Sequence, residues 1–191
     1  HYRDRRQRQM CIRDSLLAKL SETRGKDSSG ISTFNHFDNS FHVFKGPIPA
    51  NKLLKRHEVK SHLNQFYSFK NKQYTRMAFG HARLVTNGTQ LEDENNQPVI
   101  KDGIICVHNG IIVNSDELWE ENFNLVRQYQ IDTEILPSLI RHQLNLKSSL
   151  DYAIKSSICK VFGTVSVALA FNDLSKFVLA TNNGSLYVIH N

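Results

Sequence analysis

The stretch "GIICVHNGIIV" at residues 103–113 decides the fold class, because it places His108, Asn109 and Gly110 inside an otherwise apolar run. An apolar run of this length is typical of a β-strand that is buried on both faces. Buried strands rarely carry His or Asn unless those groups are paired or used. The stretch "TRMAFGHARLV" at residues 75–85 has the same character. We therefore predict two buried strands whose polar residues have a function.

Outward from these two strands, the hydrophobic pattern predicts a chain of short elements with no repeat. The remaining predicted elements are, in chain order, a helix over 16–24 that ends at a glycine C-cap (Gly25), a hairpin of strands 30–37 and 40–47, helices over 50–59 and 61–69, a polar loop over 86–103, a capped helix start at 114–123, helices over 132–144 and 149–162, and strands over 163–172, 176–183 and 185–190. This order favours an α+β fold of antiparallel sheets covered by helices over a βαβ alternation.

The composition indicates one ordinary globular domain and excludes several function classes. The chain has 191 residues, of which 40% are hydrophobic and 22% charged. It has no apolar run of about 18 residues and no secretory signal, so we expect no membrane span and a cytoplasmic protein. Three cysteines and nine histidines show no disulfide framework and no metal-ligand spacing, so we expect no metal and no cofactor.

The net charge of +6 does not indicate a nucleic-acid partner, because half of it lies at the start of the chain. Residues 1–14 contain five arginines and two aspartates, a net +3, and the rest of the chain carries only the remaining +3. A small surplus spread over a whole domain is typical of a solvated surface.

The "HNG" sequence within the second strand has two interpretations. A glycine after asparagine permits positive φ and leaves its backbone N–H uncovered. The Asn109 amide and the Gly110 N–H would then be two donors of an oxyanion hole, which stabilises the tetrahedral intermediate of acyl transfer. Alternatively, Asn-Gly is the turn of a hairpin. The equally apolar flanks on both sides favour a position within a buried frame.

Two charged residues could together hold the zwitterionic end of an α-amino acid. Arg83 offers a bidentate fork for a carboxylate, and Asp132 offers an acceptor for an ammonium group. Thr86, Asn87 and Gly88 would add hydroxyl, amide and backbone donors around the same ligand. Taken singly, each charged residue is more often part of a surface ion pair.

Four motifs occur in a fixed order, namely "RGKDSSG" (24–30), "GHARLVTNG" (80–88), "VHNGIIVN" (107–114) and "DTE" (132–134). Together they resemble the glutaminase domain of class II glutamine amidotransferases, and within that family the glucosamine-6-phosphate synthase (glutamine–fructose-6-phosphate aminotransferase) branch. The resemblance covers residues 16–191. It implies an N-terminal nucleophile hydrolase fold, a four-layer αββα sandwich of antiparallel sheets.

The resemblance also implies an activity and a set of partners. Members of the family hydrolyse glutamine to glutamate and ammonia, with the thiol of an N-terminal cysteine as nucleophile and its own amine as base. In the synthase branch the ammonia passes to a sugar-isomerase domain for transfer to a phosphosugar. Glutamine and such a downstream domain are therefore the expected partners, and a homo-oligomer is left open. Other class II members, which serve purine or asparagine synthesis, remain an alternative.

Carried over motif by motif, the resemblance implies a role for each candidate residue. Arg83 would bind the glutamine α-carboxylate, and Asp132 would bind the α-amino group. Thr86, Asn87 and Gly88 would line the pocket, and Asn109 and Gly110 would form the oxyanion hole. The family commonly reads "GHTRWATHG", so Leu84 stands here for Trp and Asn87 for His. These departures bear on closure over the ligand and on glutamine affinity.

Cys11 is the nucleophile by position only. In the family a buried strand, a turn and a helix separate the cysteine from the RG-D motif, which takes roughly 20 residues. From Cys11 to Arg24 there are only 13 steps (24 − 11), and residues 12–15, "IRDS", cannot form a buried strand. The other cysteines, Cys106 and Cys159, are interpreted as packing residues.

The start of the chain, residues 1–15, is interpreted as a non-native leader. Residues 10–15, "MCIRDS", can be back-translated into the transposon end used in sequencing-library preparation, so we interpret 1–15 as translated adaptor. We then expect residues 16–191 to be a partial class II amidotransferase domain, truncated at both ends and inactive as written. The alternative is a natural non-catalytic domain that binds glutamine or regulates a partner.

Overall fold

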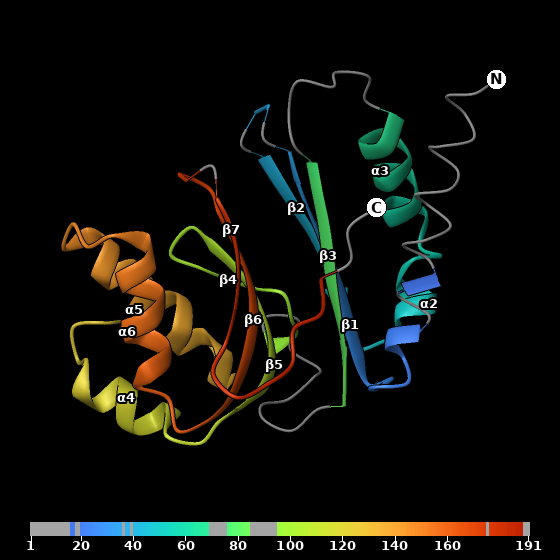
Figure 1. The fold of residues 1–191 in the computed structure, drawn as a ribbon. Helices are drawn as coiled ribbons and strands as arrows, with labels where there is room; N and C mark the ends of the chain where they lie inside the picture. Colours follow the sequence, from blue (N-terminus) through green and yellow to red (C-terminus); the bar gives the residue numbers. More distant parts are fainter. Residues whose placement is uncertain are drawn as a thin grey trace. The chain divides into compact units, whose positions relative to one another are not determined.

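A computed structural model describes residues 16–17, 20–35, 37–38, 40–68, 76–84, 95–174 and 176–188. The chain divides into two compact units, unit 1 (His1–Pro98) and unit 2 (Val99–Asn191). Each unit contains one antiparallel sheet with its own helices (Figure 1). The predicted α+β class with antiparallel sheets is therefore confirmed. Among the described residues, no helix has the length and hydrophobicity needed to cross a membrane.

The sheet of unit 1 has the strand order β2-β1-β3. Its strands are β1 (Ser28–Asn35), β2 (Ser40–Gly46) and β3 (Arg76–Arg83). The predicted hairpin is confirmed, because β1 and β2 pair antiparallel from Ser29↔Gly46 to Asn35↔Ser40. In the connection, the Asp38 carboxylate accepts hydrogen bonds from the Ser40 backbone N–H at 3.0 Å and from its hydroxyl at 2.6 Å, as an Asx-type turn does.

The helices of unit 1 are divided differently from the prediction. The structure has α2 (Ala50–Leu53) and α3 (His57–Ser68), with the break at residues 54–56 instead of residue 60. Leu53 and Val59 are both fully buried. In one continuous helix, six steps of about 100° each would place these side chains about 120° apart around the axis. The break therefore allows both side chains to be buried.

The predicted first helix is confirmed where the structure describes it, but the role of Gly25 is different. Residues 16–17 and 20–21 are helical, and a turn follows at 22–24. Gly25 does not have the positive φ of a glycine C-cap. Instead, a Cβ at Gly25 would lie 2.0 Å from the backbone nitrogen of Leu84. A glycine is required here because the end of β3 passes directly over it.

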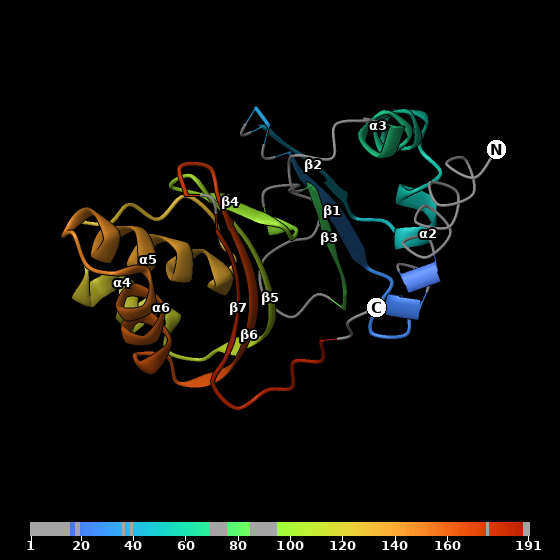
Figure 2. The ribbon, with the colours of Figure 1, turned by 45° about the horizontal axis from the view of Figure 1, so that its top comes forward.

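The sheet of unit 2 has the strand order β4-β5-β6-β7, and its helices lie on one face of it (Figure 2). Its elements are β4 (Val99–Lys101), β5 (Ile104–Ile112), α4 (Ser115–Glu121), the 3-10 helix η2 (Asp132–Glu134), α5 (Ile135–Asn145), α6 (Leu150–Cys159), β6 (Gly163–Phe171) and β7 (Phe177–Thr181). β5 and β6 are central and pair from Ile104↔Phe171 to Ile112↔Gly163.

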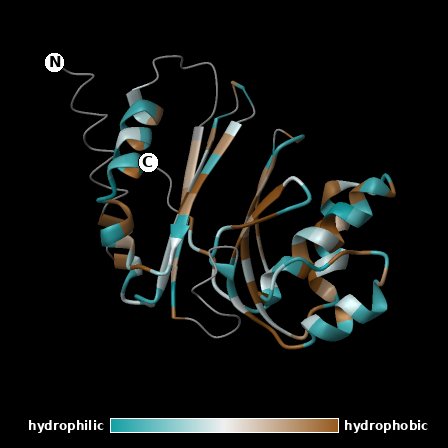
Figure 3. Ribbon diagram, turned by 180° about the vertical axis from the view of Figure 1, so that it is seen from behind, coloured by the Kyte–Doolittle hydropathy of each residue, from teal (hydrophilic) through white to brown (hydrophobic). Residues whose placement is uncertain are grey.

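One hydrophobic core fills the space between this sheet and its helices. Alternate residues of β6 face it, namely Val165, Val167 and Leu169, as the two-residue period of a strand requires. Trp119 of α4 and Leu136 of α5 pack against the same cluster. The helices are amphipathic, with hydrophobic and hydrophilic sides in Figure 3. Packing of these apolar sides stabilises the unit, since burial contributes about 25 cal/mol per Å² of apolar surface.

Four further predictions differ from the structure. β3 is an edge strand with Ala78 and Gly80 exposed, so it is not buried on both faces. The predicted polar loop contains β4. Residues 185–188 form no strand, and Tyr187 is 88% exposed there.

The Asn114 side chain does not cap α4, because it bonds instead to the backbone at Lys160 and Phe162. An apolar pattern predicts burial only when a partner element covers it.

Candidate active site

The "HNG" sequence lies within β5 and not in a turn. Asn109 pairs with Ser166 and Gly110 with Val165 of β6, which excludes the hairpin-turn interpretation. Gly110 has φ of 144°, and a Cβ there would lie 1.8 Å from the Thr164 carbonyl oxygen. A glycine is therefore the residue that this position admits. Asn109 and Gly110 are both exposed, so a ligand can reach them.

Asp132 is fixed at the same end of β5. It is the first residue of η2 and is 9% exposed. Its Oδ2 accepts a hydrogen bond from the Ile112 backbone N–H at 2.9 Å. The structure thus brings the "HNG" and "DTE" motifs together, with the carboxylate tied to the strand two residues after Gly110.

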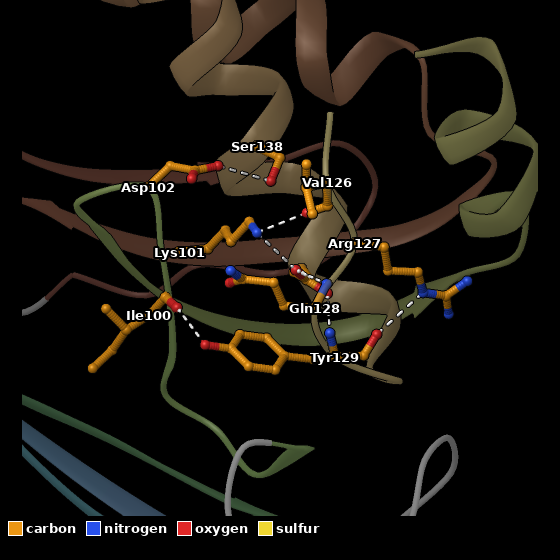
Figure 4. A network of polar contacts seen from close by, with 9 residues as sticks. Ile100, Lys101, Asp102, Val126, Arg127, Gln128, Tyr129 and Ser138 are labelled. Carbon is orange, nitrogen blue, oxygen red and sulfur yellow. Dashed lines mark hydrogen bonds and ion pairs between the residues drawn. The ribbon is translucent and has the colours of Figure 1, made fainter. Parts of the chain in front are cut away.

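A buried ion pair holds the other end of the 3-10 turn. Lys101 Nζ lies 3.2 Å from Glu134 Oε1, and the two side chains are 4% and 0% exposed. Lys101 also donates to the Val126 carbonyl at 2.7 Å, as Figure 4 shows. The Glu134 carboxylate accepts the backbone N–H groups of Gln128 and Tyr129 at 2.8 and 2.7 Å. Both charges of this ion pair are compensated, as burial requires.

The turn between β4 and β5 is tied to α5 by a second set of polar contacts. Ser138 donates to the Asp102 carboxylate at 3.0 Å, and Arg141 Nε donates to the Asp102 carbonyl at 2.8 Å. Arg141 also forms a bidentate pair with Asp173 at 2.7 and 2.9 Å. The hydrogen bond from Arg141 lowers the pKa of Asp173. These contacts fix the ends of β4 and β5 against the helix that follows Asp132.

In unit 1 the structure brings together the two other motifs. Ser28 of "RGKDSSG" pairs with Arg83 of "GHARL", and Gly30 pairs with His81. The Asp27 backbone N–H donates to the Arg83 carbonyl at 3.2 Å. Arg83 is 9% exposed. Two motifs far apart in sequence therefore form neighbouring strands, with Arg83 at the end of β3.

Several predicted site residues stay predictions. Cys11, Thr86, Asn87 and Gly88 lie outside the described residues. Arg83 belongs to unit 1 and Asp132 to unit 2. Leu84, which stands where the family has Trp, is 59% exposed.

The two described cysteines differ. Cys106 is fully buried in the core of unit 2. Burial, and secondarily the Asp132 carboxylate, raises the pKa of the Cys106 thiol, so it remains protonated and unreactive. Its interpretation as a packing residue is confirmed. Cys159 is exposed at the end of α6, so its interpretation as a packing residue is wrong.

The comparison with protein families agrees with the motifs. The model of the glutamine amidotransferase domain matches residues 81–191, more than half of the chain. The chain belongs to the glutamine amidotransferase domain family. Asn109, Gly110 and Asp132, and also Arg83, lie within the matched part.

Two curated relatives of this amidotransferase domain carry the same name. The chain is 30% identical over 182 residues to the glutamine–fructose-6-phosphate aminotransferase (isomerizing) of Bartonella quintana, covering 91% of this chain and 27% of the relative. The enzyme of the same name from Thermococcus kodakarensis is 30% identical over 176 residues, covering 90% of this chain and 27% of that protein. The chain thus spans about a quarter of the length of the curated relatives it matches.

Solved structures show the same fold for the amidotransferase domain. Glutamine phosphoribosylpyrophosphate amidotransferase from B. subtilis, complexed with ADP and GMP, has a TM-score of 0.61 at 23% identity. The match covers 88% of this chain and 33% of that one. The structure of the allosteric regulatory enzyme of purine biosynthesis has a TM-score of 0.61 at 24% identity, and the match covers 86% of this chain and 33% of that one. This likeness shows that the chain shares the fold of these two structures.

Proposed function

We propose that this chain is a glutaminase-type domain that binds glutamine by its zwitterionic end and its side-chain amide. The proposed contacts are the α-ammonium group with Asp132, the α-carboxylate with Arg83, the pocket lining from Thr86, Asn87 and Gly88, and the amide carbonyl with Asn109 and the Gly110 N–H. The observation that supports it most is the meeting of the "HNG" and "DTE" motifs at one end of β5, with Asp132 bonded to Ile112.

The chemistry of this arrangement is acyl transfer. A thiolate that attacks the glutamine amide carbon produces an oxyanion, and the Asn109 amide and the Gly110 N–H are donors for it. Collapse of this intermediate breaks the C–N bond, and the amine takes up a proton and leaves as ammonia. Water then hydrolyses the remaining thioester to glutamate and restores the thiol. In the full-length protein a sugar-isomerase domain would transfer this ammonia to a phosphosugar. The name of these relatives, which contains fructose 6-phosphate, supports that acceptor.

We further propose that the polypeptide binds glutamine without hydrolysing it. Neither cysteine in the described part of the chain suits the N-terminal nucleophile that the resemblance implies, because Cys106 is buried with a raised thiol pKa and Cys159 is the last residue of α6, within the chain. Cys11 lies only 13 steps before Arg24, too few for the strand, turn and helix that separate the nucleophile from the RG-D motif in the family. Binding without hydrolysis is also what the alternative function requires, namely a non-catalytic glutamine-binding or regulatory domain. The unsuitability of Cys106 and Cys159 as nucleophiles supports both.

Calorimetric titration with L-glutamine tests the proposed contacts. Asp132→Asn keeps the acceptor for the Ile112 N–H but removes the charge, so we expect about a tenfold or larger loss of affinity. The matched control is Asp151→Asn, which changes an exposed acidic residue of α6 in the same unit, paired with Lys155 at 2.9 Å, and should leave the affinity unchanged. Equal affinity for the wild type and Asp132→Asn would contradict the role of Asp132.

An ammonia-release assay on the same samples tests turnover. We expect no ammonia above the rate without protein. Ammonia release that disappears in Cys11→Ala would contradict the non-catalytic proposal and identify Cys11 as the nucleophile.

A further inference from the structure

His108 is a buried residue of β5 that contacts two other elements of unit 2. It is 2% exposed. Its Nδ1 lies 3.0 Å from the hydroxyl oxygen of Thr133 in η2, and its Nε2 lies 3.1 Å from the Thr164 carbonyl oxygen in β6. Thr133 is fully buried. One imidazole ring therefore bridges the 3-10 turn that begins with Asp132 and the strand that pairs with Gly110.

The partners of the ring determine its tautomer. A carbonyl oxygen only accepts hydrogen bonds, so Nε2 must carry the proton that it donates to Thr164. In the neutral imidazole, Nδ1 is then unprotonated and is an acceptor for the Thr133 hydroxyl at 3.0 Å, a shorter contact than the one between this hydroxyl and Asp132 Oδ1 at 3.5 Å. This bond fixes the Thr133 side chain and ties the middle of the "DTE" turn to β5, in addition to the Asp132–Ile112 bond.

The same ring lies against Gly110. A Cβ added at Gly110 would lie 2.8 Å from His108 Nε2 and 1.8 Å from the Thr164 oxygen that this nitrogen contacts. The space that a side chain would occupy is thus filled by the His108–Thr164 hydrogen bond. His108 contacts the backbone of the proposed oxyanion segment on one side and the turn of the proposed ammonium acceptor on the other.

We propose that His108 is a positioning residue that holds Asp132 in place relative to Gly110, and thereby sets how strongly the site prefers a ligand with an α-ammonium group. The proposal rests on the proposed function, in which Asp132 contacts that group. Loss of the His108–Thr133 bond would release the turn and weaken the ammonium contact more than the contacts with the amide end of the ligand.

The first experiment measures the tautomer by ¹⁵N NMR of the His108 ring in the full chain. The expected result is a protonated Nε2 and an unprotonated Nδ1 near neutral pH. A ring protonated at Nδ1 alone would overturn the proposal, because such a ring could not donate to Thr164.

The second experiment measures ligand preference by titration. The ratio of the dissociation constants of glutaramate, which is glutamine without its α-amino group, and L-glutamine isolates the contribution of the ammonium contact. We expect Thr133→Val and His108→Gln each to reduce this ratio by about fivefold. Thr133→Ser, which keeps the hydroxyl, should retain the wild-type ratio.

The matched control is Ser157→Ala. Ser157 is 1% exposed, and its hydroxyl donates to the Ala153 carbonyl within α6 at 2.7 Å. Its loss removes a similarly buried hydroxyl whose hydrogen bond lies within α6, so stability should fall while the ratio stays constant. Trp119 fluorescence verifies that each variant is folded. If His108→Gln does not fold, the near-isosteric Thr133→Val provides the test.

The outcomes separate this proposal from the proposed function. A wild-type preference for glutamine that survives both Thr133→Val and His108→Gln would overturn the role of His108 alone. A wild-type ratio near one would overturn it together with the contact between Asp132 and the ammonium group.

Discussion

The two units hold their predicted site residues in different ways. In unit 2, Asp132 and Gly110 lie at the end of a central strand, and buried polar partners such as Lys101, Glu134 and His108 fix the surrounding backbone. In unit 1, Arg83 is the last residue of an edge strand in which Ala78 and Gly80 are exposed. Similar apolar sequence runs thus give one strand whose geometry is determined by many partners and one that depends mainly on β1. Substitutions should therefore cost more in unit 2.

The largest expected effect is at the buried ion pair. Lys101→Met leaves the Glu134 carboxylate buried without its cation, so the free energy of unfolding of unit 2 should fall by about 3–5 kcal/mol. Urea unfolding followed by the fluorescence of Trp119, the single tryptophan of the chain, measures this. Adding Glu134→Gln should recover part of the loss, because it removes the unpaired charge.

The matching change in unit 1 is Arg56→Met. Arg56 and Glu58 lie 3.9 Å apart with side chains 42% and 63% exposed, so the loss should be below about 1 kcal/mol, measured by native-state hydrogen exchange of β1. Similar losses in the free energy of unfolding of the two units would contradict the proposed difference between them.

The second expected effect compares two strand glycines. Gly110→Ala places a Cβ 1.8 Å from the Thr164 oxygen at a φ of 144°, and should cost about 3 kcal/mol. Gly80→Ala in β3 places its Cβ 2.8 Å from the Gly30 oxygen, at an edge strand that can move, and should cost about 1 kcal/mol. Hydrogen exchange of β5 and β3 amides measures both. A larger loss for Gly80→Ala would reverse the proposed difference between the sheets.

The smallest expected effect is the pH dependence of unit 1. Burial of His62, and secondarily its neighbour His42, lowers the pKa of the His62 imidazole. Protonation then favours the unfolded chain, so stability is fully present above a pH of about 6.5 and falls as the pH drops through the lowered pKa.

Hydrogen exchange of the β1–β2 amides at pH 7 and pH 5 measures this effect. His62→Phe, which keeps a ring beside Phe66, should reduce the difference between the two pH values. The exposed His57 provides the control, since His57→Gln should leave the difference unchanged. An unaltered pH dependence in His62→Phe would show that other groups cause it.

The sequence predicted the features that depend on local pattern. The β1–β2 hairpin, the buried start of β5 and the need for glycine at 110 follow from periodicity and from backbone sterics. The division between α2 and α3 did not follow, because it depends on which face of each helix the sheet covers. The roles of Lys101 and His108 were also missed. A buried lysine is recognisable only when its partner Glu134 is known, and that partner lies in another element, far along the chain.

The close approach of Gly25 to the backbone of Arg83 and Leu84 has a consequence for how this domain can vary in evolution. The two places are far apart in the sequence, yet the space between them admits no side-chain carbon. A homologue with a larger residue at position 25 must also displace the end of β3, and with it the arginine. Because the crowding atoms belong to the backbone, no substitution at 83 or 84 makes room for a side chain, and position 25 should remain glycine in relatives that keep this path of β3.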